Sequence, residues 1–139
     1  MRRWMTIFIL IWPLAAGGLS WLHSYDQAVK LAKQEGKNIM VFVEAEHCPF
    51  CEEMRREVLS DPDVVKALEH SFVPVRLEIN DRAIRQHFPH TSVTPTTYFV
   101  TPRGEILMDI VGRINAEFFY WRLDAAEREA ARIRKAMKR

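Results

Sequence analysis

Cysteine is scarce in this sequence: 139 residues contain only two, Cys48 and Cys51. A disulfide between them would close almost no loop, whereas a structural bridge stabilises a fold more as the loop it closes grows longer. Internal repeats, low-complexity tracts and linkers are also absent. A chain of this length is long enough for one hydrophobic core and too short for two comfortable domains. We therefore expect one domain. We also expect that the two cysteines do not serve to cross-link distant segments of the chain.

The body of the chain lacks an excess of charge of either sign. The sequence has 20 Lys and Arg against 18 Asp and Glu, and the arginines at positions 2 and 3 account for the difference. A neutral body gives no electrostatic basis for binding nucleic acid, so no nucleic-acid partner is expected. Residues 122–139 are locally basic. We interpret them as a solvated helix face, with contact to an anionic surface as the alternative.

Long apolar runs are absent except near the N-terminus. Two arginines precede an apolar stretch over residues 4–14, and small residues follow it, as in a secretory signal peptide. Residues 1–20 are therefore expected to be a signal peptide. The alternative is an uncleaved anchor over residues 4–22, because about 20 apolar residues span a bilayer. Both interpretations place the folded part, residues 21–139, outside the cytoplasm.

The rest of the chain alternates between helical and strand patterns, which predicts an α/β domain. Strands are expected over residues 38–44, 72–79, 96–100 and 106–111. Helices are expected over residues 24–35, 52–59, 62–70 and 81–88, and from residue 115 to near the C-terminus. The pattern also predicts that several aromatic and aliphatic side chains join the core: Trp21, Phe118, Phe119, Trp121, Leu123, Ala126, Ala130, Ile133 and Met137.

The two cysteines stand between a strand-like run and a helix-forming run. This order places Cys48 at a helix N-terminus, where unpaired N–H groups and the helix dipole stabilise a thiolate. The thiolate is the reactive species in thiol–disulfide exchange. Cys48 is expected to attack, and Cys51, one turn further in, to resolve the mixed disulfide. The alternatives are a structural disulfide that closes only this short turn, and a metal site. Phe50 offers an apolar surface to a partner chain.

Two motifs make the chain resemble the thioredoxin fold. Cys48-Pro49-Phe50-Cys51 directly follows the first core strand, and Val93-Thr94-Pro95-Thr96 opens the third strand, with Pro95 placed 44 residues after Cys51. Over residues 22–125 the chain resembles bacterial periplasmic thioredoxin-like thiol–disulfide oxidoreductases. The resemblance implies a thioredoxin fold with a central mixed β-sheet flanked by helices, and a periplasmic location.

The resemblance also implies the residues of the site. Cys48 and Cys51 would form a redox-active disulfide, and Pro95 would follow a cis peptide bond beside it. That bond would leave the backbone of Thr94 free to pair with a substrate peptide, next to Phe50. His47 and Glu46 adjoin the first cysteine and are candidates to tune its pKa.

The sequence departs from thioredoxins at one catalytic position. Thioredoxins carry a buried acid six residues before the first cysteine, where it serves proton transfer at the second thiol; this chain has Phe42 there. Glu44 and Glu46 are the candidates to replace it. His47 also stands where thioredoxins usually have tryptophan.

The subgroup resemblance implies a reductase of protein disulfides that takes electrons from a membrane thiol-relay protein. No bound cofactor and no metal are expected, because the disulfide itself carries two electrons. Pro49 and His47 would also suit a periplasmic oxidant. A copper- or haem-handling module that uses the two thiols as ligands is a second alternative, and a non-catalytic interaction protein a third. His87 and His90 complete a formal zinc pattern, but 35 residues separate them from Cys51, far more than in a zinc finger.

Overall fold

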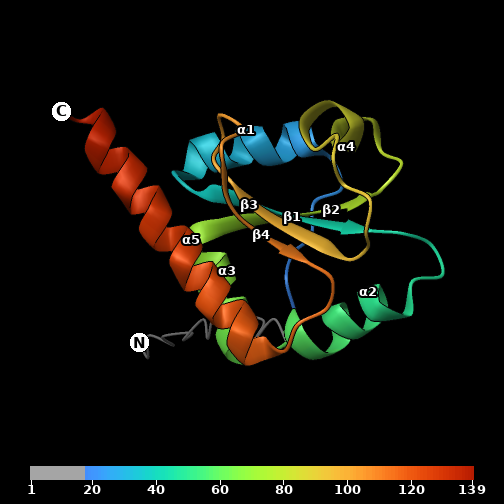
Figure 1. The fold of residues 1–139 in the computed structure, drawn as a ribbon. Coiled ribbons are helices and arrows are strands. Elements are labelled where there is room, and N and C mark those ends of the chain that lie inside the picture. Colours follow the sequence, from blue (N-terminus) through green and yellow to red (C-terminus); the bar gives the residue numbers. More distant parts are fainter. Residues whose placement is uncertain (1–17) are drawn as a thin grey trace, which may run out of the picture.

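The computed structural model describes residues 18–139 (Figure 1). The expected signal peptide over residues 1–20 and the alternative anchor over residues 4–22 lie mostly in residues 1–17, outside the described part. Within residues 18–139, no helix is both long enough and apolar enough to cross a membrane.

A four-stranded mixed sheet forms the centre of the domain. Its strands are β1 (Asn38–Glu44), β2 (Phe72–Glu78), β3 (Thr96–Val100) and β4 (Ile106–Val111), in the spatial order β2-β1-β3-β4. β1 runs parallel to β2 and antiparallel to β3, and β3 pairs antiparallel with β4. The thioredoxin fold predicted from the motifs is confirmed.

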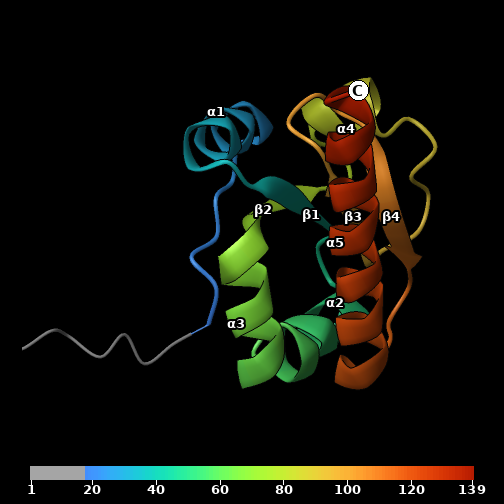
Figure 2. The same ribbon diagram turned by 90° about the vertical axis from the view of Figure 1, so that its left-hand side faces the viewer.

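Helices cover both faces of the sheet (Figures 1 and 2). The chain contains α1 (Tyr25–Glu35), α2 (Pro49–Glu53), the π-helical turn η1 (Met54–Val58), α3 (Pro62–Ser71), α4 (Arg82–His87) and α5 (Ala116–Met137). One core cluster joins α1 and α4 to the sheet, and the other joins α2, η1, α3 and α5 to its opposite face. β1 serves both clusters: Met40 and Phe42 face the second, while Ile39, Val41 and Val43 face the first.

Local sequence signals define the helix ends. The Ser24 hydroxyl accepts the Gln27 N–H at the start of α1, and Gly36 ends that helix with a φ of 66°, a left-handed value that glycine adopts readily. Asp61 caps α3 and Asn115 caps α5 in the same way. The predicted elements therefore agree closely with the observed ones.

One helix differs in kind from its prediction. The segment after the cysteines is not one regular α-helix to residue 59, because α2 passes into η1 after Glu53. The Leu59 N–H donates to the Met54 carbonyl, five residues back, at 2.9 Å. Such π turns appear mostly as single turns within helices, frequently at functional sites.

The predicted burial of the α5 aromatics is partly wrong. α5 buries Phe119, Leu123, Ala126 and Ala130, but Phe118 and Trp121 are 53% and 55% exposed. They fall between the positions that face the sheet, and they pack edge-to-face on each other with ring centroids 5.2 Å apart. Met137 is also exposed. Trp21 is half-buried, at a ring-centroid distance of 5.9 Å from Phe42.

The chain upstream of α1 takes part in the fold. Leu19 is buried in the same core cluster as Leu59 and Phe119. Leu22 forms a parallel bridge along the outer edge of β2, where its N–H donates to the Pro74 carbonyl and its carbonyl accepts the Arg76 N–H. Pro74 therefore lies on an edge strand with its nitrogen turned away from β1, the arrangement that proline in a strand requires.

We predict that Leu19→Ala lowers the free energy of unfolding by about 2 kcal/mol, because it removes a buried side chain from a packed cluster. Urea denaturation of the full chain measures the change, with Ser20→Ala, at the exposed neighbouring position, as the matched control. A loss no larger than that of the control would show that the domain does not need residue 19.

Candidate active site

Cys48 and Cys51 are joined by a disulfide, with Cα atoms 5.3 Å apart. β1 ends at Glu44, a short turn follows, and Cys48 is the N-cap residue of α2. Its backbone is extended, and its Sγ accepts the Cys51 N–H at 3.2 Å. Pro49 occupies the first turn, where its missing N–H leaves no unsatisfied donor. The sequence thus builds a helix start around the first sulfur.

The two cysteines differ in exposure. Cys51 is 1% exposed and lies in the core cluster, whereas Cys48 is half-buried at the edge of that cluster. In the reduced state, Cys48 is therefore the thiol that a partner protein can reach. The Cys51 N–H points at the Cys48 sulfur from the first turn of α2, and a helix N–H in this position favours a thiolate over a thiol.

The loop before β3 brings Thr94 against the disulfide. The Thr94–Pro95 peptide bond is cis, and the Thr94 hydroxyl donates to the Cys48 Sγ at 3.5 Å. The Thr94 N–H and carbonyl have no backbone partner among residues 18–139. The sequence led us to expect the backbone of Thr94 beside the sulfur but gave no sign that its hydroxyl would reach it.

The loop after β4 ties the cis-proline loop to the cysteine helix. The Gly112 N–H donates to the Pro95 carbonyl at 2.8 Å. The next residue, Arg113, forms an ion pair of 2.7 Å with Glu53, two residues after Cys51. Neither contact is visible in the sequence, because β4 and α2 meet only through the tertiary fold.

Phe42 is fully buried in the same cluster as Cys51, so an apolar ring occupies the thioredoxin acid position. Glu44, one of the candidate replacements, is held by two arginines. Its carboxylate lies 2.8 Å from Arg76 on β2 and 3.1 Å from Arg55 on η1. These ion pairs tie the end of β1 to its neighbouring strand and to the helix that carries the cysteines.

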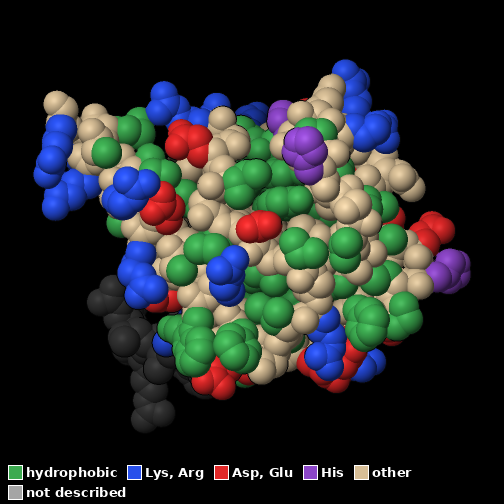
Figure 3. All heavy atoms as spheres, in the orientation of Figure 1, with side chains coloured by type: hydrophobic (Ala, Val, Ile, Leu, Met, Phe, Trp, Pro, Cys, Tyr) green, Lys and Arg blue, Asp and Glu red, His purple; other side chains and the backbone are tan. Residues whose placement is uncertain are grey.

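Two further sequence candidates, Glu46 and His47, line a hollow of about 520 Å³ together with Cys48. His47 has a φ of 55°, in the left-handed region, and is exposed, as is Glu46. Phe50 is 60% exposed, and Figure 3 shows hydrophobic side chains gathered over the α2 region. Within residues 18–139, no three His, Cys, Asp or Glu side chains are arranged to hold a metal ion.

The fold and the cysteine pair define a class of protein. Residues 25–127 match the family model of the thioredoxin-like domain. The chain belongs to the thioredoxin-like domain family. Family membership, the fold and the Cys48–Cys51 pair support thiol–disulfide oxidoreductase activity.

Solved structures share this fold, and a curated relative matches most of the chain. A thioredoxin from Thermus thermophilus superimposes with a TM-score of 0.67 at 29% identity, covering 78% of this chain and 86% of that one. A DsbH oxidoreductase gives a TM-score of 0.63 at 20% identity, with coverage of 83% and 89%. Anterior gradient protein 3 of Mus musculus is 21% identical over 101 residues, which cover 73% of this chain. The match spans 61% of that relative's length.

We predict that Thr94→Val raises the pKa of the Cys48 thiol in the reduced protein. The substitution removes a hydroxyl that donates to the sulfur, and a hydrogen bond of this kind contributes about 0.5–1.5 kcal/mol. Thiolate absorbance at 240 nm, followed as a function of pH, measures the shift. Thr94→Ser keeps the donor and should titrate like the unmodified protein. If the thiolate titrations of the valine and serine variants had the same pH midpoint, the Thr94 hydroxyl would not influence the pKa of the Cys48 thiol.

Proposed function

We propose that this chain is an exported thiol–disulfide oxidoreductase that reduces disulfides in other proteins. The observation that carries the proposal is the asymmetric cysteine pair. One sulfur is at the surface, receives an N–H and a hydroxyl, and lies beside a cis-proline loop. The other is buried directly behind it.

The first step forms a mixed disulfide. In the reduced protein, the Cys48 thiolate attacks one sulfur of the substrate disulfide. A new S–S bond forms, the substrate's own S–S bond breaks, and the second substrate sulfur leaves as a thiolate. The helix N–H and the Thr94 hydroxyl stabilise the negative charge on Cys48 before attack.

The second step releases the substrate. Cys51 gives up its proton, which the substrate thiolate released in the first step accepts, and the Cys51 sulfur attacks the Cys48 sulfur. The mixed disulfide breaks, and the other substrate sulfur leaves as a thiolate. The protein is left with its Cys48–Cys51 disulfide, and two electrons have passed to the substrate. Exchange with a donor dithiol restores both thiols, so the cycle needs no bound cofactor.

The substrate would lie across the surface next to Cys48. The backbone of Thr94 can accept an extended peptide by edge pairing, because its N–H and carbonyl are not used within the domain. Pro95 holds this segment in place, while Phe50 and Val93, which are 60% and 45% exposed, offer apolar contact. His47 and Glu46 would tune the charge around the attacking sulfur.

Export and the electron donor complete the proposal. Residues 1–20 would direct the chain across the inner membrane and place the domain in the periplasm. Because Leu19 and Leu22 take part in the fold, a cleaved signal would end before Leu19, and an anchor would use the part of residues 4–22 that precedes it. A membrane thiol-relay protein would then supply the electrons. The N-terminal sequence pattern and the resemblance to periplasmic oxidoreductases support both points.

We predict that Cys51→Ser traps a covalent complex with substrate proteins, because the mixed disulfide at Cys48 can no longer be resolved. Cys48→Ser should leave no attacking thiol and abolish insulin-disulfide reduction. Non-reducing electrophoresis of the full-length variants and an insulin turbidity assay measure these outcomes, with Ser60→Ala at an exposed site as control.

Other results would contradict the proposal. If the protein kept its function in the cell after both Cys48 and Cys51 were replaced by serine, the chain would be an interaction protein rather than an oxidoreductase. Stoichiometric copper binding by the reduced chain, without insulin reduction, would assign the thiols to metal handling.

A further inference from the structure

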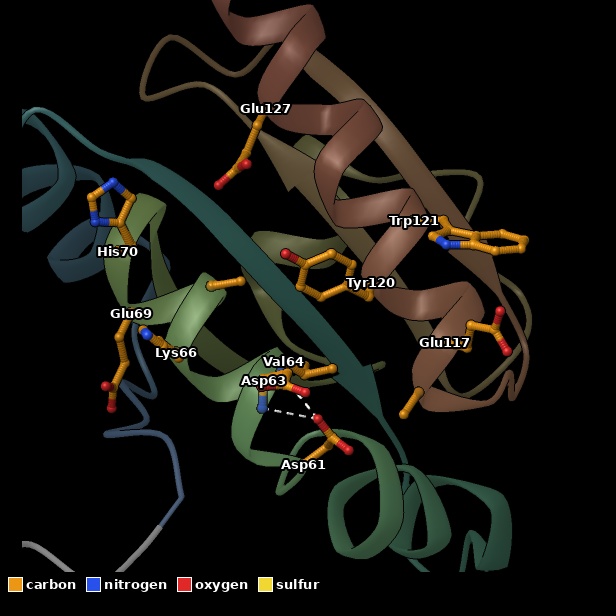
Figure 4. A pocket seen from close by; sticks show the side chains of 12 residues that line it. Asp61, Asp63, Val64, Lys66, Glu69, His70, Glu117, Tyr120, Trp121 and Glu127 are labelled. Atoms are coloured by element: carbon orange, nitrogen blue, oxygen red, sulfur yellow. Dashed lines mark hydrogen bonds between the residues drawn. The ribbon is translucent and has the colours of Figure 1, made fainter.

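A second hollow lies between α3 and α5 and shares no residue with the disulfide site. Its volume is about 1010 Å³, roughly twice that of the hollow beside Cys48. Figure 4 shows its two walls: α3 carries Asp61 at one end and His70 at the other, and α5 carries Glu117 and Glu127 at the corresponding ends. We call this hollow the α3–α5 groove.

Negative charge dominates the α3–α5 groove. Five carboxylates line it against one lysine, Lys66. Two of the five are engaged within the domain: Asp61 accepts N–H groups as the cap of α3, and Glu127 accepts the Ser71 hydroxyl. The other three have no ion pair or side-chain hydrogen bond among residues 18–139: Asp63, Glu69 and Glu117. Residues 21–139 carry no net charge, so this excess of carboxylates arises because the fold places α3 beside α5.

Apolar groups lie between these carboxylates. Val64, Ala67 and Ala116 line the groove, and Tyr120 extends from α5 toward α3 in Figure 4. Tyr120 and Trp121 are 44% and 55% exposed, although they are large aromatic side chains. Exposed aromatics of this kind are enriched at protein interfaces, and their faces attract cations.

We infer that the α3–α5 groove binds a basic amphipathic segment of a partner protein. Apolar side chains of the segment would lie against Tyr120 and Ala67, while its Lys or Arg side chains would reach Asp63 on one wall and Glu117 on the other. Trp121 extends from α5 on the side away from α3, as Glu117 does in Figure 4, so a cation drawn to Glu117 suits a cation–π contact with the Trp121 ring.

The dimensions of the groove fit such a segment. Ten residues separate Glu117 from Glu127 along α5, which corresponds to about 15 Å at 1.5 Å per helical residue. A partner helix of about three turns therefore spans it. The same unpaired carboxylates repel anionic lipid headgroups and nucleic acid, so a polypeptide is the occupant that the charges favour.

Anisotropy of a fluorescein-labelled 14-residue peptide, with leucine and lysine at helical spacing, tests the inference on the full chain. We expect saturable one-to-one binding that weakens at least tenfold in the double variant Asp63→Lys, Glu117→Lys. The control double variant Glu105→Lys, Asp109→Lys changes the net charge equally on the exposed β4 side and should bind like the unmodified protein. Tyr120→Ser tests the apolar contact without a change of charge and should also weaken binding.

A second peptide, in which serine replaces every leucine, should bind at least tenfold more weakly. If both double variants lost binding equally, or if the two peptides bound equally well, binding would depend on net charge alone. Either result would overturn the inference. Self-association lost in Tyr120→Ser would instead assign the groove to a second copy of the chain. Binding that appears only after removal of residues 1–17 would assign it to the chain's own first residues.

Discussion

The complete burial of β1 is the constraint on which the rest of the structure depends. Five consecutive residues, 39–43, have no exposed surface, because alternate side chains enter the two core clusters on opposite faces of the sheet. A strand held on both faces cannot shift by one residue without exchanging the two sets of side chains. The turn that follows therefore delivers Cys48 to one place, at the start of α2 and against the loop of the cis proline.

The surrounding polar contacts keep that geometry together. Glu44 joins β1 to β2 and η1 through Arg76 and Arg55, and Arg113 joins the β4 loop to α2 through Glu53. These residues lie around the disulfide rather than on it, so they position the sulfurs while leaving Cys48 open to a partner. Phe42, an apolar ring, is buried in the same core cluster as Cys51.

Much of the fold was predictable because local signals and burial patterns agreed. The Ser24 cap, the Gly36 stop and the continuous apolar run of β1 each predicted an element that the structure contains. The exposure of Phe118 and Trp121 was not predicted, since a helix rich in apolar residues does not reveal which face meets the sheet.

At the site, the sequence predicted the cysteine pair, and the cis bond followed only from family resemblance. The arginine partners of Glu44 and the approach of the Thr94 hydroxyl to sulfur depend on strand register and loop packing. Residues far apart in the chain make these contacts, and no local pattern encodes them. The groove between α3 and α5 escaped prediction for the same reason, because its carboxylates come from two separate helices.

The equilibrium reduction potential of the Cys48–Cys51 pair tests the central claim most directly. The full chain would be equilibrated in dithiothreitol or glutathione buffers of defined ratio, and the reduced fraction measured by alkylation. A potential near that of thioredoxin, about −270 mV, is what a reductase fed by a thiol relay requires. A potential near about −120 mV would identify a strong oxidant and contradict the reducing direction of the account.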